Sequence, residues 1–414
     1  MECIFDFLLD SEQARLRKLA QLQTEKFEDT IVSYKKIFLN QLNLLKNEKI
    51  EGSCFAKEDS NEFKNTKNHQ QLEKIRKIIS EVPIEDIENF FDTLRDIYLY
   101  WLKSQSKKAV STLEDLLTKY NLFDFKFNIA NKLMYRGRES SNIPYNTYDM
   151  FHIPFNKRYL IGNQRFSLPG IPLLYLGTSL YDVVVELDLG TKNFERMSFS
   201  YFYIKKDHFN IYNLTNDFYQ FFELDNIIEK SVKTKDIKKE FFKLILSSVN
   251  SFEKKGKINK EKHLMFYEEY ILPQILTQVL VSSKYKFKGI LYSSTKLRNP
   301  ENDKTYKTDY KNNIVIFTQY FENRHYDYKL YEQFDISNPL TSSAILNGNT
   351  ISIEKLKNLL NSSFLSTKLS IGSEYLRNFE NIKIEEKPYF EHDVGKCQTF
   401  MIYNFLLIEK MNNN

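Results

Sequence analysis

The chain has 414 residues, with 59 basic and 54 acidic side chains and a net charge of +5. We expect two or three domains with real hydrophobic cores, because a single core stops growing at about 250 to 300 residues. Basic and acidic residues interleave through most of the sequence, which argues against a concentrated nucleic-acid-binding stripe.

Membrane, secretory and metal-binding classes are disfavoured. No apolar run reaches the roughly 18 to 20 residues of a membrane span, and the longest, around residues 271 to 281, is interrupted by a proline and a glutamine. The first residues lack the basic segment of a signal peptide. The three cysteines, Cys3, Cys54 and Cys397, are far apart and lack metal-ligand spacing. We therefore expect a cytoplasmic protein with neither a membrane segment nor a metal.

The first part of the chain predicts a helical bundle. Apolar side chains recur at helical spacing over residues 10–47, which predicts one long helix there, and over 72–82, 84–102 and 112–120, which predict shorter ones. A polar loop is expected at 57–69. A helical nuclease would need an arginine and a histidine close together on one helix, but this region has only His69, in that loop. We predict a domain over 1–125 for regulation or for forming a homo-oligomer.

After residue 125 the pattern changes to short strands mixed with helices. Strands are expected at 197–204, 209–212, 289–292 and 313–317, and helices at 218–229, 237–248 and 273–283. A polar insertion covers 298–312. A C-terminal extension should contain a helix at 353–360 and strands near Ile382 and at 400–408. The predicted fold class is α+β, with a catalytic domain over 126–335 and an extension over 336–414 that packs on it.

Two arginine-containing segments and a tyrosine indicate a site for a phosphorylated aromatic ligand. Arg136 and Arg138 lie in Tyr-Arg-Gly-Arg, and Arg165 lies in Gln-Arg-Phe-Ser. The planar guanidinium matches a phosphate bidentately and stays charged when partly buried. Tyr175 ends an apolar run that predicts a buried strand, and its ring offers a flat face to a base.

A carboxylate follows on the next predicted helix. Glu186 lies eleven residues after Tyr175, in an apolar segment whose N-cap should be Thr178 or Ser179. The apolar neighbours of Glu186 argue for an inward or cleft-lining position. A carboxylate placed there can bond ribose hydroxyls and stabilise the cation that forms when a glycosidic bond breaks.

Together these segments resemble the RES domain, a family named for its arginine, glutamate and serine. The resemblance rests on Leu133–Arg138, Met150–Pro154, Arg165–Gly170, Leu174–Leu176, Val185-Glu186 and Phe287–Thr295. It covers roughly residues 130 to 320 and places the family's serine at Ser294. It implies a fold related to ADP-ribosylating toxins and an enzyme that degrades NAD by hydrolysis or phosphorolysis at the nicotinamide–ribose bond.

The resemblance also implies a role for each residue. Arg136 and Arg165 hold the diphosphate, with Arg138 beside them, and Tyr175 stacks near the nicotinamide. Glu186 orients the ribose and stabilises oxocarbenium character, while Ser294 bonds the departing amide or an incoming phosphate. NAD is then a substrate rather than a cofactor, phosphate a co-substrate, and an antitoxin or activating protein the expected partner. The role we expect is that of a toxin or a phage-defence effector that depletes cellular NAD. Many family members are about half this length and are encoded beside an antitoxin, so this role follows less closely from the resemblance than the chemistry does.

Other interpretations remain open at this level. The same site could transfer ADP-ribose to a macromolecule, or the chain could sense NAD or a related nucleotide without turnover. Taken singly, several of these residues have ordinary structural explanations, and Arg165 could anchor a loop by stacking. Those with such explanations are Arg136 and Arg138 as solvated surface, Tyr175 as a core or rim aromatic, Glu186 as a helix-surface carboxylate, and Ser294. His152 precedes Ile-Pro, a context typical of a structural histidine.

Overall fold

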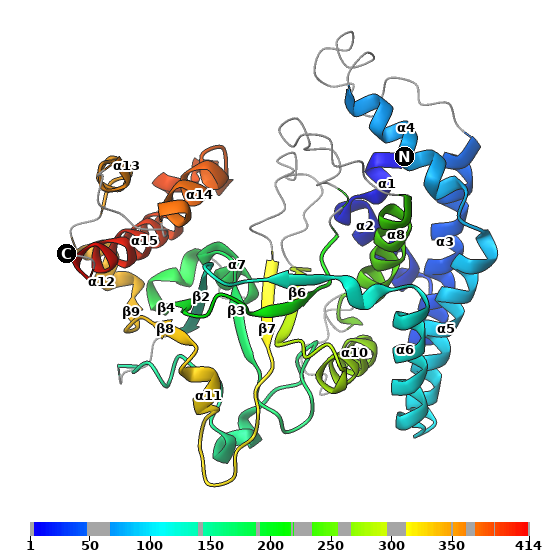
Figure 1. Ribbon diagram of the computed structural model, residues 1–414, viewed down its shortest axis with the longest axis horizontal. Coiled ribbons are helices and arrows are strands. Elements are labelled where there is room, and N and C mark those ends of the chain that lie inside the picture. Colours follow the sequence, from blue (N-terminus) through cyan, green and yellow to red (C-terminus); the bar gives the residue numbers. More distant parts are fainter. Residues whose placement is uncertain are drawn as a thin grey trace.

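The computed structural model describes residues 4–47, 67–139, 144–187, 191–216, 218, 234–255, 266–295, 312–348, 351–361, 369–384 and 386–412. Its helices come first and a mixed sheet with further helices follows, which confirms the predicted α+β class (Figure 1). Most of the helix predicted at 218–229 and most of the loops predicted at 57–69 and 298–312 lie outside the described residues.

The helical part contains α1 (Ile4–Leu8), α2 (Asp10–Leu22), α3 (Phe27–Asn47), α4 (Lys67–Ser80), α5 (Ile84–Leu102) and α6 (Ser106–Lys119). The single helix predicted over 10–47 is wrong, because the chain turns between Leu22 and Phe27. At the turn, the Thr24 hydroxyl donates to the Ala20 carbonyl and meets the Thr30 hydroxyl at 2.7 Å. Such side-chain bonds compete with the helical ladder.

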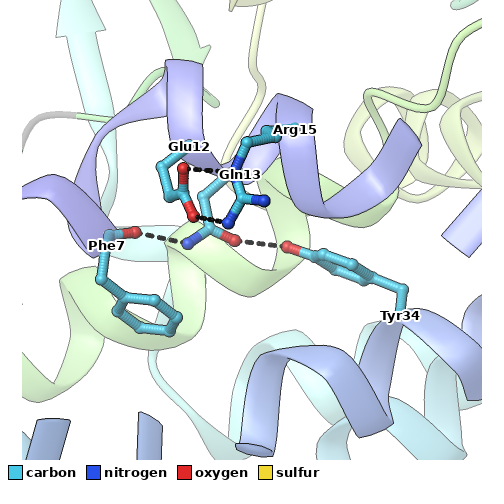
Figure 2. Close-up of polar contacts among 5 residues, drawn as sticks. All are labelled: Phe7, Glu12, Gln13, Arg15 and Tyr34. Atoms are coloured by element: carbon cyan, nitrogen blue, oxygen red, sulfur yellow. Dashed lines mark hydrogen bonds and ion pairs between the residues drawn. The ribbon is translucent and has the colours of Figure 1, made fainter. Parts of the chain in front are cut away.

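Buried Gln13 joins the first three helices, as Figure 2 shows. Its Nε2 donates to the Phe7 carbonyl and its Oε1 accepts from the Tyr34 hydroxyl, both at 2.5 Å. Arg15 and Glu12 pair on the more exposed side of α2. Because the amide of Gln13 is satisfied on both sides, it fixes how α1, α2 and α3 meet without a cost in buried polarity.

The strands are β1 (Lys126–Asn128), β2 (Leu133–Glu139), β3 (Leu174–Gly177), β4 (Met197–Ile204), β5 (Asn210–Asn213), β6 (Gly289–Ser293), β7 (Asn312–Ile316), β8 (Phe334–Ile336) and β9 (Leu340–Thr341). They form one sheet in the order β1-β5-β6-β7-β3-β2-β4-β8, with β9 beside β4. The β5–β6 pair is parallel and the other neighbouring strands are antiparallel. The predicted strands at 197–204, 209–212, 289–292 and 313–317 are confirmed to within about one residue at each end.

The sheet is weakest in its middle, between β2 and β3. These strands share one paired position, Tyr135 with Gly177, although β2 continues to Glu139 and β3 begins at Leu174. Beyond that position β2 pairs only with β4, and β3 pairs only with β7. The two halves of the sheet therefore separate between β2, which carries Arg136, and β3, which carries Tyr175.

One hydrophobic core joins the helical region to the sheet. It extends from Ile4 and the following helices to Ile290 and Val315, and it includes α8 (Thr234–Val249) and α10 (Ile271–Ser282). Figure 1 shows α8, drawn in green, among the blue N-terminal helices. Both helices confirm segments that the sequence predicts as helical. A domain boundary near residue 125 would cut through this core, and the proposed division stays a prediction.

The C-terminal part contains α11 (Tyr328–Tyr331), α12 (Ser342–Asn347), α13 (Ile353–Asn361), α14 (Leu369–Phe379), β10 (Lys383–Ile384), β11 (Lys387–Pro388) and α15 (Asp393–Asn412). The strand predicted at 400–408 is wrong, because those residues belong to α15. A short apolar run fits either structure, and here it is the buried part of a 20-residue helix. The described helices include none with the length and apolarity that a bilayer crossing requires.

Candidate functional site

The helix that carries Glu186 is fixed at both of its sides. In α7 (Leu180–Glu186) the N-cap is Ser179, one of the two residues that the sequence offers for it, and it forms a reciprocal capping box with Asp182. The Gln398 side chain of α15 accepts from the Leu180 amide at 3.0 Å. Against the sheet, Val183 packs over Gly137, where an added Cβ would meet its Cγ1 at 2.8 Å. Glycine is thus required for this close approach.

At the C-terminal end of α7, Glu186 meets two strands. Its Oε1 accepts from the Ser294 hydroxyl at 2.5 Å and from the Asn313 Nδ2 at 2.8 Å. Ser294 directly follows β6, Asn313 lies in β7, and both are buried. The structure therefore brings together Glu186 and Ser294, which are 108 residues apart in the sequence.

Two tyrosines line the same face of the sheet. Tyr175 of β3 and Tyr292 of β6 flank β7, and the register of the strands places both side chains on the face that carries Asn313. The Tyr175 hydroxyl meets the Ser167 hydroxyl at 3.1 Å. Burial raises the pKa of Tyr292 well above its usual value, and the charge of Glu186 raises it further. Both phenols stay protonated at neutral pH, as hydrogen-bond donors.

Arg165 is engaged by backbone carbonyls. Its Nη1 donates to the Asn250 carbonyl at 2.7 Å, and its Nη2 donates to the Phe252 carbonyl at 3.0 Å and to the Thr295 hydroxyl at 3.4 Å. The guanidinium also lies 5.2 Å from the centre of the Tyr270 ring. These bonds connect the candidate site to the segment after α8, which packs on the N-terminal helices through Phe252.

Arg136 and Arg138 lie on the other face of the sheet. Successive side chains of a strand point to opposite faces of the sheet. Arg136, which pairs with Ser200 of β4, lies between Tyr135 and Gly137 in β2, so it points away from the face of those two residues. The neighbouring even-numbered residue, Met134, belongs to the core that contains Leu174 and Leu176. The two arginines are therefore not on the face of Glu186 and Ser294, although they lie beside the place where β2 and β3 separate.

Arg136 carries a buried nitrogen that is unsatisfied within the described residues, its Nη1. Burial lowers the pKa of Arg136 to about 9, and the nearby charge of Arg138 lowers it further. Arg136 is thus still charged at neutral pH. A buried donor without an acceptor costs about 1 to 3 kcal/mol, and more when the group is charged, and an anion bound there would relieve that cost.

His152 is structural, as its sequence context predicts. Its ring is buried: Nδ1 donates to the Ile153 carbonyl at 2.7 Å, and Nε2 accepts from the Asp327 amide at 3.0 Å. Burial is the main cause that lowers the pKa of His152 to about 4, so the ring is neutral. Both nitrogens are used within the fold.

Two side chains at the site were missed from the sequence, namely Asn313 and Asp182, while Tyr292 lies in the Phe287–Thr295 segment of the resemblance but was given no role. Asp182 is fully buried, and burial raises its pKa well above the usual value, with the charge of Glu186 adding to the effect. The helical spacing from Glu186 could have indicated Asp182. Nothing in the sequence marks Asn313, because only the strand register brings it to α7. In the described parts of the chain, no three His, Cys, Asp or Glu side chains gather to hold a metal.

Comparison with known proteins gives one informative similarity. The chain is 29% identical over 293 residues to a Bacillus subtilis (strain 168) protein named "Putative toxin YopC". The similar region covers 66% of this chain and 62% of that protein, so the chain spans less than two thirds of its relative. No family model and no solved structure matches the chain.

Proposed function

We propose that this protein cleaves the bond between nicotinamide and ribose in NAD, on an ADP-ribosyltransferase-like fold of the RES type. The observation that carries the proposal is the 2.5 Å hydrogen bond from the Ser294 hydroxyl to Glu186. The resemblance assigns these two residues to one site from separate motifs, and the fold joins them. A buried serine and a carboxylate beside two tyrosines are suited to a ribose and an aromatic ring.

The chemistry follows from where charge develops. When the glycosidic bond breaks, its electron pair leaves with nicotinamide and the ribose becomes cationic, so a fixed carboxylate stabilises the transition state. Glu186 has that role in the proposal, and it also bonds the ribose hydroxyls. The Tyr175 ring stacks near the nicotinamide. Ser294 bonds the departing amide or positions phosphate, and water or phosphate then adds to the ribose.

The diphosphate is assigned mainly to Arg136, and its buried Nη1, which has no hydrogen-bond partner among the described residues, supports this assignment. Arg165 contributes less directly, because its terminal nitrogens already bond the carbonyls of Asn250 and Phe252. The separation of β2 from β3 places Arg136 and Tyr175 on neighbouring strand edges. An elongated dinucleotide lying across this separation would reach groups on both faces of the sheet.

The similarity to YopC supports a toxin role, in which the enzyme depletes the NAD of the cell. Such an activity has to be restrained in the cell that makes it. We accordingly propose an antitoxin or an activating trigger as the partner. The helical region is the proposed place of regulation or self-association.

The test is to incubate purified protein with NAD, with and without phosphate, and to identify the products by chromatography and mass spectrometry. We expect free nicotinamide in both cases, with ADP-ribose or its 1-phosphate as the second product. Glu186→Gln keeps the shape of the side chain but removes its charge, so turnover should fall by ~100-fold or more while NAD binding persists. Glu195→Gln, an exposed change of the same chemistry, is the matched control.

The alternatives predict different results. Transfer to a macromolecule would appear as label from the adenine part of NAD on protein or nucleic acid. A sensing module would bind NAD and return it unchanged. Equal loss of binding and turnover in Glu186→Gln would indicate a structural carboxylate and would contradict the proposed role.

A further inference from the structure

The structure assigns to Asn313 a positioning role, in which its side-chain amide holds the Glu186 carboxylate in the orientation that serves catalysis. The inference deepens the proposed function and rests on it. Asn313 belongs to no motif of the RES resemblance, and it lies in a strand whose other four residues include three aliphatic ones. An amide there needs an explanation other than core packing.

Asn313 and Ser294 act on the same carboxylate oxygen. Their donor atoms lie 2.8 Å and 2.5 Å from Oε1 of Glu186. They approach from two different strands, so together they restrict rotation of the carboxylate about its last side-chain bond. Loss of the Asn313 donor would remove one of these two restraints.

Asn313 is itself held firmly by the sheet. Its backbone pairs with Tyr292 of β6 on one side and with Gly177 of β3 on the other. The residue is 5% exposed. The amide therefore reaches α7 from the centre of the sheet, where its backbone has little freedom, and a fixed donor of this kind can pre-orient a charged group before substrate binds.

The chemical identity of the amide is also informative. Asparagine donates through Nδ2 without bringing a charge, so it orients Glu186 while leaving its negative charge available for the ribose cation. A lysine or arginine at the same place would neutralise that charge. An aspartate would repel it.

The test compares steady-state NAD cleavage by wild-type protein, Asn313→Ala and Asn313→Asp. We expect kcat to fall by ~10- to 100-fold in Asn313→Ala, with KM for NAD changed by less than ~3-fold, because the alignment of a reacting group is lost while ligand contacts remain. Asn313→Asp preserves volume and should be slower still. Asn358→Ala, an exposed change on α13, should match the wild type.

The outcomes separate the two claims. Wild-type kcat in a folded Asn313→Ala or Asn313→Asp protein would overturn the positioning role while leaving the proposed function intact. A rise in KM with unchanged kcat would also overturn it, since Asn313 would then be a substrate contact. If wild-type protein leaves NAD intact, the proposed function fails, and the role of Asn313 in it fails as well. Circular dichroism and thermal unfolding establish that each variant is folded, and the isosteric Asn313→Asp serves if the alanine variant is not.

Discussion

Gly137, which lies in β2 against α7, offers a test of how closely the sheet and the helix that carries Glu186 must approach each other. In Gly137→Ala, the new Cβ would lie 2.8 Å from Cγ1 of Val183 and 2.9 Å from Cε1 of Phe199. Apolar carbons normally stay about 3.5 to 4.0 Å apart. The substitution therefore requires a displacement of roughly 1 Å, shared between α7 and the Phe199 ring.

Two effects of different size follow from this displacement. Overpacking of a well-filled core costs about 1 to 3 kcal/mol of unfolding free energy. Misplacement of a catalytic group by about 1 Å costs roughly 100-fold in rate. Gly137→Ala should thus remain folded, with a lower unfolding midpoint in urea, and should cleave NAD ~100-fold more slowly than wild type.

A second substitution tests the mechanism of this loss. Val183→Ala removes the atom that the new methyl group meets, so the double variant Gly137→Ala/Val183→Ala should recover much of the lost rate. Gly162→Ala is the control, because an added Cβ there meets nothing within 4 Å. A Gly137→Ala protein with the wild-type rate, or a double variant no faster than the single one, would refute the argument that the helix is displaced.

Two further predictions concern buried polar groups. Arg165→Ala should lower the unfolding free energy by about 3 kcal/mol or more. The reason is that it removes two charge-assisted bonds and leaves the Asn250 and Phe252 carbonyls without their donor. A loss of stability below ~1 kcal/mol, together with a tenfold higher KM for NAD, would instead identify Arg165 as a diphosphate clamp. His152 has a pKa that is lower in the folded state, about 4, than in the unfolded chain, about 6.5. The unfolded state therefore binds more protons than the folded state as the pH falls through this range. Between pH 7 and pH 5 the wild-type protein should lose roughly 1 to 2 kcal/mol more of its unfolding free energy than His152→Gln. Equal losses in the two proteins would contradict a buried, neutral His152.

Local signals in the sequence predicted the elements around the site well. Ser179, one of the two predicted N-caps, does begin α7, whereas its capping box with Asp182 was not predicted, because an aspartate stands where the usual signature has glutamate or glutamine. Glu186 and Ser294 were identified through ordered motifs, each of which is weak by itself. Their hydrogen bond was not predictable from spacing, because it depends on how β6 packs against the end of α7.

What sequence reasoning missed depends on tertiary arrangement. The alternation of side chains in β2 places Arg136 and Tyr135 on opposite faces of the sheet. The face that α7 covers is set by tertiary packing, in which Val183 lies against Gly137 and Gly177. In the sequence, Asn313 stands at the polar start of an apolar strand and has no sign of function. Only the structure shows that it lies beside Glu186. The error at residues 400–408 has a similar origin, since α15 begins at Asp393, before the apolar run.

The shared core also has a consequence for when activity can arise during synthesis. Ile4 and Val315 belong to one cluster of buried side chains, so the first helices emerge from the ribosome long before the strands that complete their packing. Contacts so distant in sequence close slowly, and the early segments expose apolar surface until then. At ~5 to 20 residues per second, this interval lasts tens of seconds. For the function proposed above, this order of synthesis means that NAD cleavage would begin only after most of the chain has been translated, which gives the proposed antitoxin time to accumulate.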